Sequence, residues 1–266
     1  MNISDLKNYK KSEDPPLVVL TAYTAPMARI ISPLVDLLLV GDSVGTALYG
    51  MPGTRGVTLD MMQAHGKAVC RVTEGTNVII DMPFGSYDDP ESALENAQFL
   101  LNDTGAGAVK LEGGISIAPV IETLTNADIP VIGHVGLQPQ SEMEGFKAKG
   151  RNSEDAEKIL ADAVAVQKSG AIALVIEAVF EPLARKITED VSIPTIGIGA
   201  SPECDGQVLV SDDMLGLCGD FSPRFVKRYA DLESHITSAV TCYANEVRDR
   251  LFPDDKHVYK KRQNTK

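Results

Sequence analysis

Residues 78–112 have the sequence VIIDMPFGSYDDPESALENAQFLLNDTGAGAVKLE, and this stretch contains one full repeat of the pattern that decides the fold. An apolar run ending in Asp81 is followed by a turn, a helical segment over Pro90–Leu101 and a second apolar run ending in Glu112. Gly105 stands after the helical segment, where a helix C-cap belongs. The stretch therefore predicts a strand, a helix and a second strand parallel to the first.

The same alternation continues in both directions along the chain. Amphipathic or Ala-rich segments, such as residues 59–72 and 153–167, separate eight short apolar runs. Eight strands alternating with helices in 266 residues predict an α/β fold, a closed (β/α)₈ TIM barrel, with an open doubly wound sheet as the alternative. The runs are Leu17–Leu20, Leu37–Val40, Val78–Ile80, Ala108–Leu111, Val131–Ile132, Ile172–Ile176, Thr195–Ile198 and Val208–Val210.

The two ends of the chain differ from its middle. Residues up to about Lys11 predict an N-terminal helix that plugs the barrel floor, and Ile236–Leu251 predicts a long C-terminal helix. From about residue 254 the sequence is polar and basic, so we expect a mobile tail there. Because no linker interrupts the pattern, we expect residues 1–266 to form a single (β/α)₈ barrel domain.

Composition excludes several classes of partner. The chain has 25 Lys and Arg against 37 Asp and Glu, a net charge of −12, which disfavours binding to nucleic acid or to a membrane surface. The four cysteines form no CxxC pair, so we expect reduced thiols and no zinc site. The N-terminus has no apolar signal segment, and we expect a cytoplasmic protein.

Carboxylates stand at the ends of four predicted strands: Asp42, Asp81, Glu112 and Glu177. In a barrel all strand carboxyl ends open on one face, so these groups should converge. Four negative charges in a small space call for a cation, and Mg²⁺ suits oxygen ligands and leaves positions open for substrate. Alternatively, a single such acid can merely cap the next helix.

Two basic side chains belong to the same expected face. Lys110 alternates with Glu112 along one strand, so both should point into the barrel. Lys110 is either a salt-bridge partner of an acid or a cation that holds a substrate carboxylate. His134 follows the fifth strand and is either a neutral hydrogen-bonded residue or a catalytic group.

Motifs spread from Leu17 to about Phe252 resemble those of the ketopantoate hydroxymethyltransferase (3-methyl-2-oxobutanoate hydroxymethyltransferase) family, in family order. Long colinear matches are more specific than any single short motif. The matching segments are Leu20–Tyr23, Val40–Gly45, Val57–Asp60, Asp81–Phe84, Val109–Gly114, Gly133–Leu137, Pro139–Ser141, Lys149–Arg151, Ile196–Ala200 and Cys204–Leu209.

The resemblance implies roles for individual residues. Asp42, Asp81 and Glu112 match the magnesium-associated acids of the family, and Glu177 matches its proton acceptor. The substrate-binding residues expected on this basis are Asp42, Ser43, Asp81, Lys110 and His134.

The resemblance also implies a reaction and an assembly. The family is a Mg²⁺-dependent transferase of pantothenate biosynthesis that enolises 2-oxoisovalerate and adds the one-carbon unit of 5,10-methylenetetrahydrofolate to give ketopantoate. We therefore expect a small 2-oxo acid and a folate as partners, and a homo-oligomer, commonly a decamer. Two alternatives stay open: a Mg²⁺-dependent 2-oxo acid lyase or phosphoenolpyruvate mutase-like enzyme on a related barrel, and a non-catalytic barrel scaffold.

The sequence departs from the family pattern at a few positions. Thr24 stands where the family usually has Asp, and Ser201 replaces a common Gly. The loop 142–146 replaces a stretch that is often richer in Gly. The first and the last of these departures bear on substrate closure or folate fit, and none falls on the expected acids or Lys110.

Overall fold

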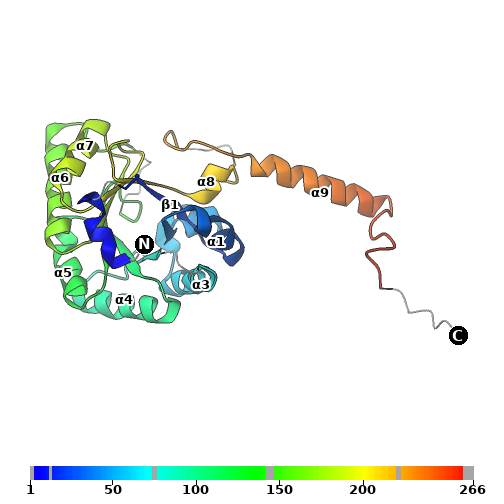
Figure 1. Cartoon of the computed structure of the whole chain (residues 1–266), viewed down its shortest axis with the longest axis horizontal. Helices are drawn as coiled ribbons and strands as arrows, with labels where there is room; N and C mark the ends of the chain where they lie inside the picture. The colour runs from blue at the N-terminus through cyan, green and yellow to red at the C-terminus, as the bar shows by residue number, and fades with distance from the viewer. Residues whose placement is uncertain (1–2, 12–13, 74–76, 142–146, 220–222, 260–266) are drawn as a thin grey trace. The chain divides into compact units, whose positions relative to one another are not determined.

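The computed structural model describes residues 3–11, 14–73, 77–141, 147–219 and 223–259. Its contacts divide the chain into two compact units: residues 1–211 with 223–226, and residues 212–222 with 227–266. In the first unit, eight parallel strands close into a barrel in sequence order (Figure 1). The strands are β1 (Leu17–Thr21), β2 (Leu37–Val40), β3 (Asn77–Asp81), β4 (Ala108–Glu112), β5 (Val131–Gly136), β6 (Ala173–Glu177), β7 (Thr195–Ile198) and β8 (Gly206–Leu209).

Helices lie around the outside of this barrel (Figure 1). Asp89 caps the helix between β3 and β4 by accepting hydrogen bonds from two backbone N–H groups, and Gly105 ends it in the left-handed conformation at φ 79°. The helices are α1 (Ala25–Ile31), α2 (Val44–Ala47), α3 (Leu59–Cys70), α4 (Pro90–Thr104), α5 (Ala118–Asn126), α6 (Ser153–Lys168) and α7 (Glu181–Asp190), with 3₁₀ turns η2 (Ser32–Leu34), η3 (Thr54–Gly56) and η4 (Ile115–Ile117).

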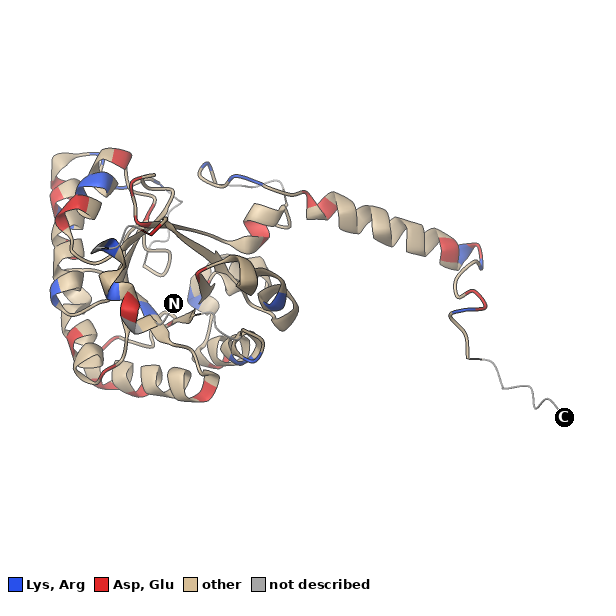
Figure 2. Cartoon of the chain, viewed as in Figure 1, with Lys and Arg blue, Asp and Glu red and all other residues tan. Residues whose placement is uncertain are grey.

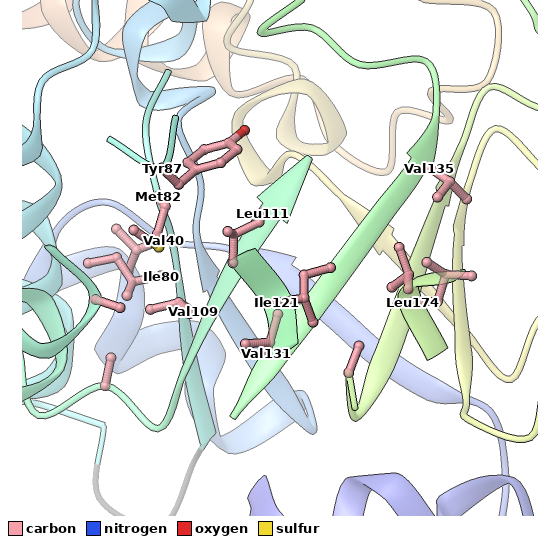
Figure 3. Packing of buried hydrophobic residues seen from close by; sticks show 14 of the residues in the cluster. Val40, Ile80, Met82, Tyr87, Val109, Leu111, Ile121, Val131, Val135 and Leu174 are labelled. Carbon is pink, nitrogen blue, oxygen red and sulfur yellow. The ribbon is translucent and has the colours of Figure 1, made fainter. Parts of the chain in front are cut away.

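Two hydrophobic layers hold the barrel together. Side chains pointing outward from the strands, such as Val40, Ile80 and Val109, pack with residues of the helices (Figure 3). Side chains at the alternate positions, such as Leu37 and Ile79, fill the barrel interior. The absence of Trp is consistent with this core, which is built almost entirely from aliphatic residues.

The N-terminal segment closes the barrel interior at the amino ends of the strands. It is a 3₁₀ helix, η1 (Ile3–Lys11), whose Ile3 and Leu6 belong to the interior hydrophobic cluster. Leu6 is fully buried, and a Cβ built on Gly107, just before β4, would meet Ile3 at 3.4 Å. The predicted plug is therefore present, in the tighter 3₁₀ form.

Sequence and structure agree on the barrel and differ at some boundaries. The closed barrel confirms the predicted fold and excludes the open sheet. The apolar run over residues 131–132 is part of a longer strand, so the expectation that His134 follows the strand is wrong. The apolar run ends before the strand does, because the carboxyl end of β5 faces the polar barrel mouth. Strand residues there, such as His134, need not be apolar.

The second unit is described by itself. It contains residues 212–215 of helix α8 (Ser211–Leu215) and helix α9 (Leu232–Arg248). The predicted C-terminal helix is present and starts earlier than residue 236, because Asp231 caps it by accepting a hydrogen bond from Ser234 N at 3.2 Å. No residue of α9 is buried, and Ile236, Val240 and Tyr243 are more than half exposed.

Two expectations about the C-terminal part stay predictions. The single-domain organisation is one, and the mobile basic tail from about residue 254 is the other. Residues 260–266 of that tail lie outside the described residues. Within the described ranges, no helix combines the length and the apolar character needed to span a membrane.

Candidate active site

The strands contain few charged residues (Figure 2), and the strand bounds place most of these at the carboxyl ends. Asp81, Glu112 and Glu177 are the last residues of β3, β4 and β6, and Asp42 lies just beyond β2. Because all eight strands are parallel, these ends share one mouth of the barrel. Asp42, Asp81 and Glu112 are each at most 5% exposed, so the charges are buried and must be compensated locally.

Lys110 is the central cation of the mouth. Its Nζ lies 3.1 Å from Asp81 Oδ1 and 3.2 Å from His134 Nδ1, and the strand register places Asp81 directly beside it. Burial acts to lower the pKa of the ammonium, but the charges of Asp81, Glu112 and Asp42 outweigh burial and raise the pKa. Lys110 is therefore charged at neutral pH.

Asp42 and Asp81 form the most acidic part of the cluster. The backbone N–H of Asp42 donates a hydrogen bond to Asp81 Oδ2 at 2.9 Å. Burial, together with the charges of Asp81 and Glu112, raises the pKa of Asp42 to about 7. Asp81 Oδ1 is buried and within ion-pair distance of Lys110, but no donor meets hydrogen-bond geometry with it.

Neither of these two acids serves as a helix cap. The residue at the N-cap of α2 is Ser43, which makes no side-chain capping hydrogen bond, and α4 is capped by Asp89. The helix-cap alternative is therefore wrong for Asp42 and Asp81, and their burial has no such structural explanation.

His134 connects the two remaining acids. Its Nδ1 lies 3.4 Å from Glu112 Oε1, and its Nε2 lies 3.2 Å from Glu177 Oε2 without meeting hydrogen-bond geometry. Burial and the nearby Lys110 charge lower the pKa of His134, but Glu112 and Glu177 raise it more, to about 9. The imidazolium is thus favoured over the neutral ring, and its like-charge contact with Lys110 is offset by the two carboxylates.

Ser43 faces the same space from the loop after β2. A Cβ built on Gly41 would meet Ser43 Oγ at 2.8 Å, so a side chain at this position would displace the Ser43 hydroxyl. The hydroxyl of Tyr23, after β1, lies 2.8 Å from Ser43 Oγ. Tyr23 belongs to a motif that the sequence identified, although no role was predicted for it.

The structure adds a buried amide that the sequence did not predict as a site residue. Gln140, in the loop after β5, is 1% exposed and donates from Nε2 to Asp42 Oδ2 at 2.8 Å. Its backbone N–H donates to Glu112 Oε2 at 3.0 Å. The segment Pro139–Ser141 is one of the matching motifs, and this was the only signal in the sequence that pointed to Gln140.

The donor set suits a hard divalent cation better than zinc. In the described part of the chain, no group of three His, Cys, Asp or Glu side chains is arranged to hold a metal ion. Mg²⁺ needs only one or two carboxylates, with water and substrate oxygens completing its shell. Asp42 and Asp81 fit this requirement, because they are buried carboxylates linked by the bond from Asp42 N–H to Asp81 Oδ2, and Asp81 Oδ1 accepts no hydrogen bond although it lies beside Lys110. Glu112 fits less directly, since its oxygens already contact His134 and Gln140.

Two departures from the family pattern have local explanations. Thr24 caps α1 by accepting a hydrogen bond from Met27 N at 3.4 Å, a role that Asp also fills. Ser201 Oγ lies 3.2 Å from Glu181 Oε1 and accepts a hydrogen bond from Glu203 N at 3.1 Å. The altered loop 142–146 lies outside the described residues.

Comparison with known proteins connects this site to a family. A model of the family described as ketopantoate hydroxymethyltransferase matches residues 1–255. The chain belongs to this family. It is 52% identical over 262 residues to the 3-methyl-2-oxobutanoate hydroxymethyltransferase of Rhodospirillum rubrum, covering 97% of this chain and 94% of the relative. With the enzyme of that name from Rhizobium rhizogenes it shares 55% identity over 247 residues, 92% of this chain and 90% of the relative.

Solved structures with lower identity are similar in fold. A 2,3-dimethylmalate lyase of the PEP mutase/isocitrate lyase superfamily superposes with a TM-score of 0.63 at 17% identity, covering 97% of this chain and 88% of the lyase. A phosphonopyruvate hydrolase in complex with oxalate and Mg²⁺ gives 0.61 at 14% identity, with coverages of 97% and 93%. Such identities show the barrel alone. The family match therefore confirms the predicted hydroxymethyltransferase over the lyase and scaffold alternatives.

Proposed function

We propose that the charged cluster at the barrel mouth transfers the one-carbon unit of 5,10-methylenetetrahydrofolate to 3-methyl-2-oxobutanoate, with water, giving ketopantoate and tetrahydrofolate for pantothenate biosynthesis. The name shared by the relatives supports the substrate. One observation carries the assignment of the site: Asp81, Lys110, His134 and Glu177 follow one another at distances of 3.1, 3.2 and 3.2 Å. In this line, Lys110 offers a positive charge to the carboxylate of the substrate, and Glu177 offers a carboxylate that can accept a proton from it.

Substrate binding falls to Lys110, Ser43 and their neighbours. A 2-oxo acid has a carboxylate that needs a positive partner in a buried site. The Lys110 ammonium is charged and held by Asp81, so it is oriented before substrate enters. Ser43 offers a hydroxyl, kept in place by Tyr23. His134 adds a second positive charge beside Lys110, which favours binding of an anion.

Magnesium is expected at the acidic end of the cluster. Asp42 and Asp81 would hold it, with Glu112 beside them. When bound there, Mg²⁺ polarises the keto oxygen of the substrate and makes the neighbouring C3 proton easier to remove.

Glu177 is the proposed proton acceptor. Its side chain is 13% exposed, whereas those of Asp81 and Glu112 are 3% and 2% exposed, so Glu177 is the most accessible of these three to a substrate. His134 Nε2 lies within ion-pair distance of one carboxylate oxygen, at 3.2 Å, which favours a position of the group facing the mouth. The C3 proton passes to Glu177, and the electron pair left on C3 forms the new bond to the one-carbon unit of the folate.

The test measures exchange of the C3 proton of 3-methyl-2-oxobutanoate with deuterated solvent by NMR, with Mg²⁺ and without folate. Glu177→Gln should slow this exchange by about 10²–10⁴-fold while still binding the 2-oxo acid. Glu181→Gln, an exposed glutamate four positions away, is the matched control and should exchange like the wild type. Exchange at the wild-type rate in Glu177→Gln would make Glu177 a spectator and remove it as the proton acceptor.

We also propose a homo-oligomer, a decamer as in the family, working in the cytoplasm as expected of a biosynthetic enzyme. The exposed apolar residues of α9 support association of chains, because apolar side chains gain from leaving water. Sedimentation velocity at micromolar concentration should show particles far heavier than the 28.5 kDa chain. A profile of monomers alone would remove the assembly proposal and leave the chemistry intact.

A further inference from the structure

Gln140 uses every one of its polar groups in the barrel mouth. Its side-chain nitrogen donates to Asp42 Oδ2 at 2.8 Å and to the carbonyl oxygen of Met82 at 3.0 Å. These contacts reach the segments that follow β2 and β3. A side chain amide that is 1% exposed and fully bonded has one orientation, because any rotation would leave a buried polar atom unsatisfied.

Tyr87 determines which way the amide of Gln140 points. The backbone N–H of Glu112 donates to the Tyr87 hydroxyl at 3.4 Å, and that hydroxyl donates to Gln140 Oε1. The amide oxygen is thus occupied by Tyr87, and the amide nitrogen must face Asp42. Burial is the main cause that raises the pKa of Tyr87, so the phenol remains a donor throughout the working pH range.

The backbone of Gln140 also donates a hydrogen bond to a second acid of the cluster. Its N–H donates to Glu112 Oε2 at 3.0 Å, so one residue supplies a donor to acids from both β2 and β4. Its carbonyl oxygen accepts from Arg55 Nε at 2.7 Å. Arg55 also lies over the ring of Phe84 at 4.7 Å, which connects the η3 loop, the loop after β3 and the loop after β5.

We infer that Gln140 is a positioning residue for the reaction: it directs Asp42 toward the divalent cation and fixes Glu112 beside the metal site, without neutralising either acid. The inference rests on the proposed function, in which Asp42 binds Mg²⁺. A neutral N–H orients a carboxylate and leaves its charge for the metal, whereas a lysine at the same place would compete with the cation. Lys110 contacts Asp81 instead. The charged donor Lys110 and the neutral donor Gln140 therefore bind different acids of the cluster.

The experiment compares Gln140→Met with the wild type. Methionine has a similar length and removes the amide, while the backbone bond to Glu112 remains. Binding of Mn²⁺ in the presence of 3-methyl-2-oxobutanoate is measured by electron paramagnetic resonance, and Kd should rise about 10–100-fold. The apparent KM for Mg²⁺ should rise similarly, with kcat largely recovered at saturating Mg²⁺. Gln207→Met on β8, which loses one hydrogen bond to the Ser201 carbonyl, should bind Mn²⁺ like the wild type.

The outcomes separate the inference from the proposed function. If the wild type binds no Mn²⁺ with the 2-oxo acid, both are overturned. If the wild type binds Mn²⁺ and folded Gln140→Met binds it equally well, only the inference is overturned. A purely structural role would reduce the fraction of binding-competent protein and leave Kd and KM unchanged. Should Gln140→Met fail to fold, Tyr87→Phe removes the hydroxyl that orients the amide, and wild-type affinity in that variant contradicts the inference.

Discussion

The two ends of the barrel interior are lined by opposite kinds of side chain. At the amino end, Leu6 of η1 belongs to one hydrophobic cluster with interior residues such as Leu37 and Ile79, and this end is apolar. At the carboxyl end, the interior side of each strand becomes polar. Two residues after interior Ile79, β3 carries Asp81, and two residues after interior Ile132, β5 carries His134. One continuous set of strands therefore passes from a hydrophobic floor to a buried charged cluster.

This contrast shows how the barrel divides stability from chemistry. Burial of apolar side chains at the floor stabilises the fold, and replacing them leaves a cavity. The mouth gains little from burial, because each charge there must be compensated by another group. Changes at the mouth should thus reduce activity, at a further cost in stability where they leave a buried charge uncompensated, whereas changes at the floor should reduce stability and spare activity.

The largest effect is expected at the mouth, from Asp81→Asn. This change keeps the volume but removes the charge that holds Lys110 at 3.1 Å and the carboxylate proposed for Mg²⁺. Turnover should fall about 10³-fold, or roughly 4 kcal/mol in transition-state stabilisation. Steady-state kinetics measures the loss, and Asp190→Asn, an exposed partner of Lys186, is the control. Near-normal turnover of Asp81→Asn would remove Asp81 from the proposed site.

The next effect is expected at the floor, from Leu6→Ala. Leu6 is fully buried in the interior cluster, so truncation should lower the free energy of unfolding by about 2–5 kcal/mol. Turnover at 25 °C should stay within about twofold, because no group at the mouth is touched. Urea unfolding and kinetics are measured on the same sample. Leu34→Ala, at a site 75% exposed, should change neither, and a stable but inactive Leu6→Ala would contradict the division.

Between pH 6.5 and 8, the pH dependence of stability reports chiefly on two groups of the mouth, His134 and Asp42. The pKa of His134 is raised to about 9, so the folded state binds this proton more tightly than the unfolded state does. Its stabilisation is complete below pH 6.5 and is lost as pH rises through 9. The pKa of Asp42 is raised to about 7, so its contribution to the free energy of unfolding also falls as pH rises, over a lower pH range that ends near 7. In metal-free buffer, the free energy of unfolding should fall by about 2 kcal/mol from pH 6.5 to 8.

His134→Gln provides the comparison for this pH effect. Glutamine does not titrate, so the slope between pH 6.5 and 8 should be largely lost. Urea unfolding at several pH values with EDTA measures it, and His257→Gln, at an exposed site, should keep the wild-type slope. An unchanged slope in His134→Gln would assign the proton to another group.

The smallest effect is expected outside both regions, from Thr24→Ala at the start of α1. Loss of the capping hydrogen bond to Met27 N should cost about 1 kcal/mol of stability. Thr24→Asp, the residue usual in the family, should restore the cap and match the wild type. Thermal unfolding compares the three proteins. If Thr24→Asp were as unstable as Thr24→Ala, the capping explanation of this departure would be wrong.

The sequence pointed to the acids, Lys110 and His134, and the structure brings them together, but the sequence did not point to the buried amide of Gln140. Asp42, Asp81, Glu112 and Glu177 were identifiable because each follows an apolar run, and a barrel brings strand ends together. Gln140 was not, because its partners Asp42 and Met82 are 98 and 58 residues away in the chain. A polar residue in a loop after a strand carries no periodic signal that distinguishes it from a solvent-exposed one.

By itself, the sequence determined the eight alternating strands and helices, the plug at the amino end and the acids at the carboxyl ends. Periodicity, capping residues and strand length act locally, so they can be recognised in a linear chain. Only the tertiary structure decided that Lys110 pairs with Asp81, that His134 joins Glu112 to Glu177, and that Gln140 serves Asp42. Barrel closure sets these pairings, because charges in a buried mouth respond to whichever group lies within a few ångströms, whatever its distance in the sequence.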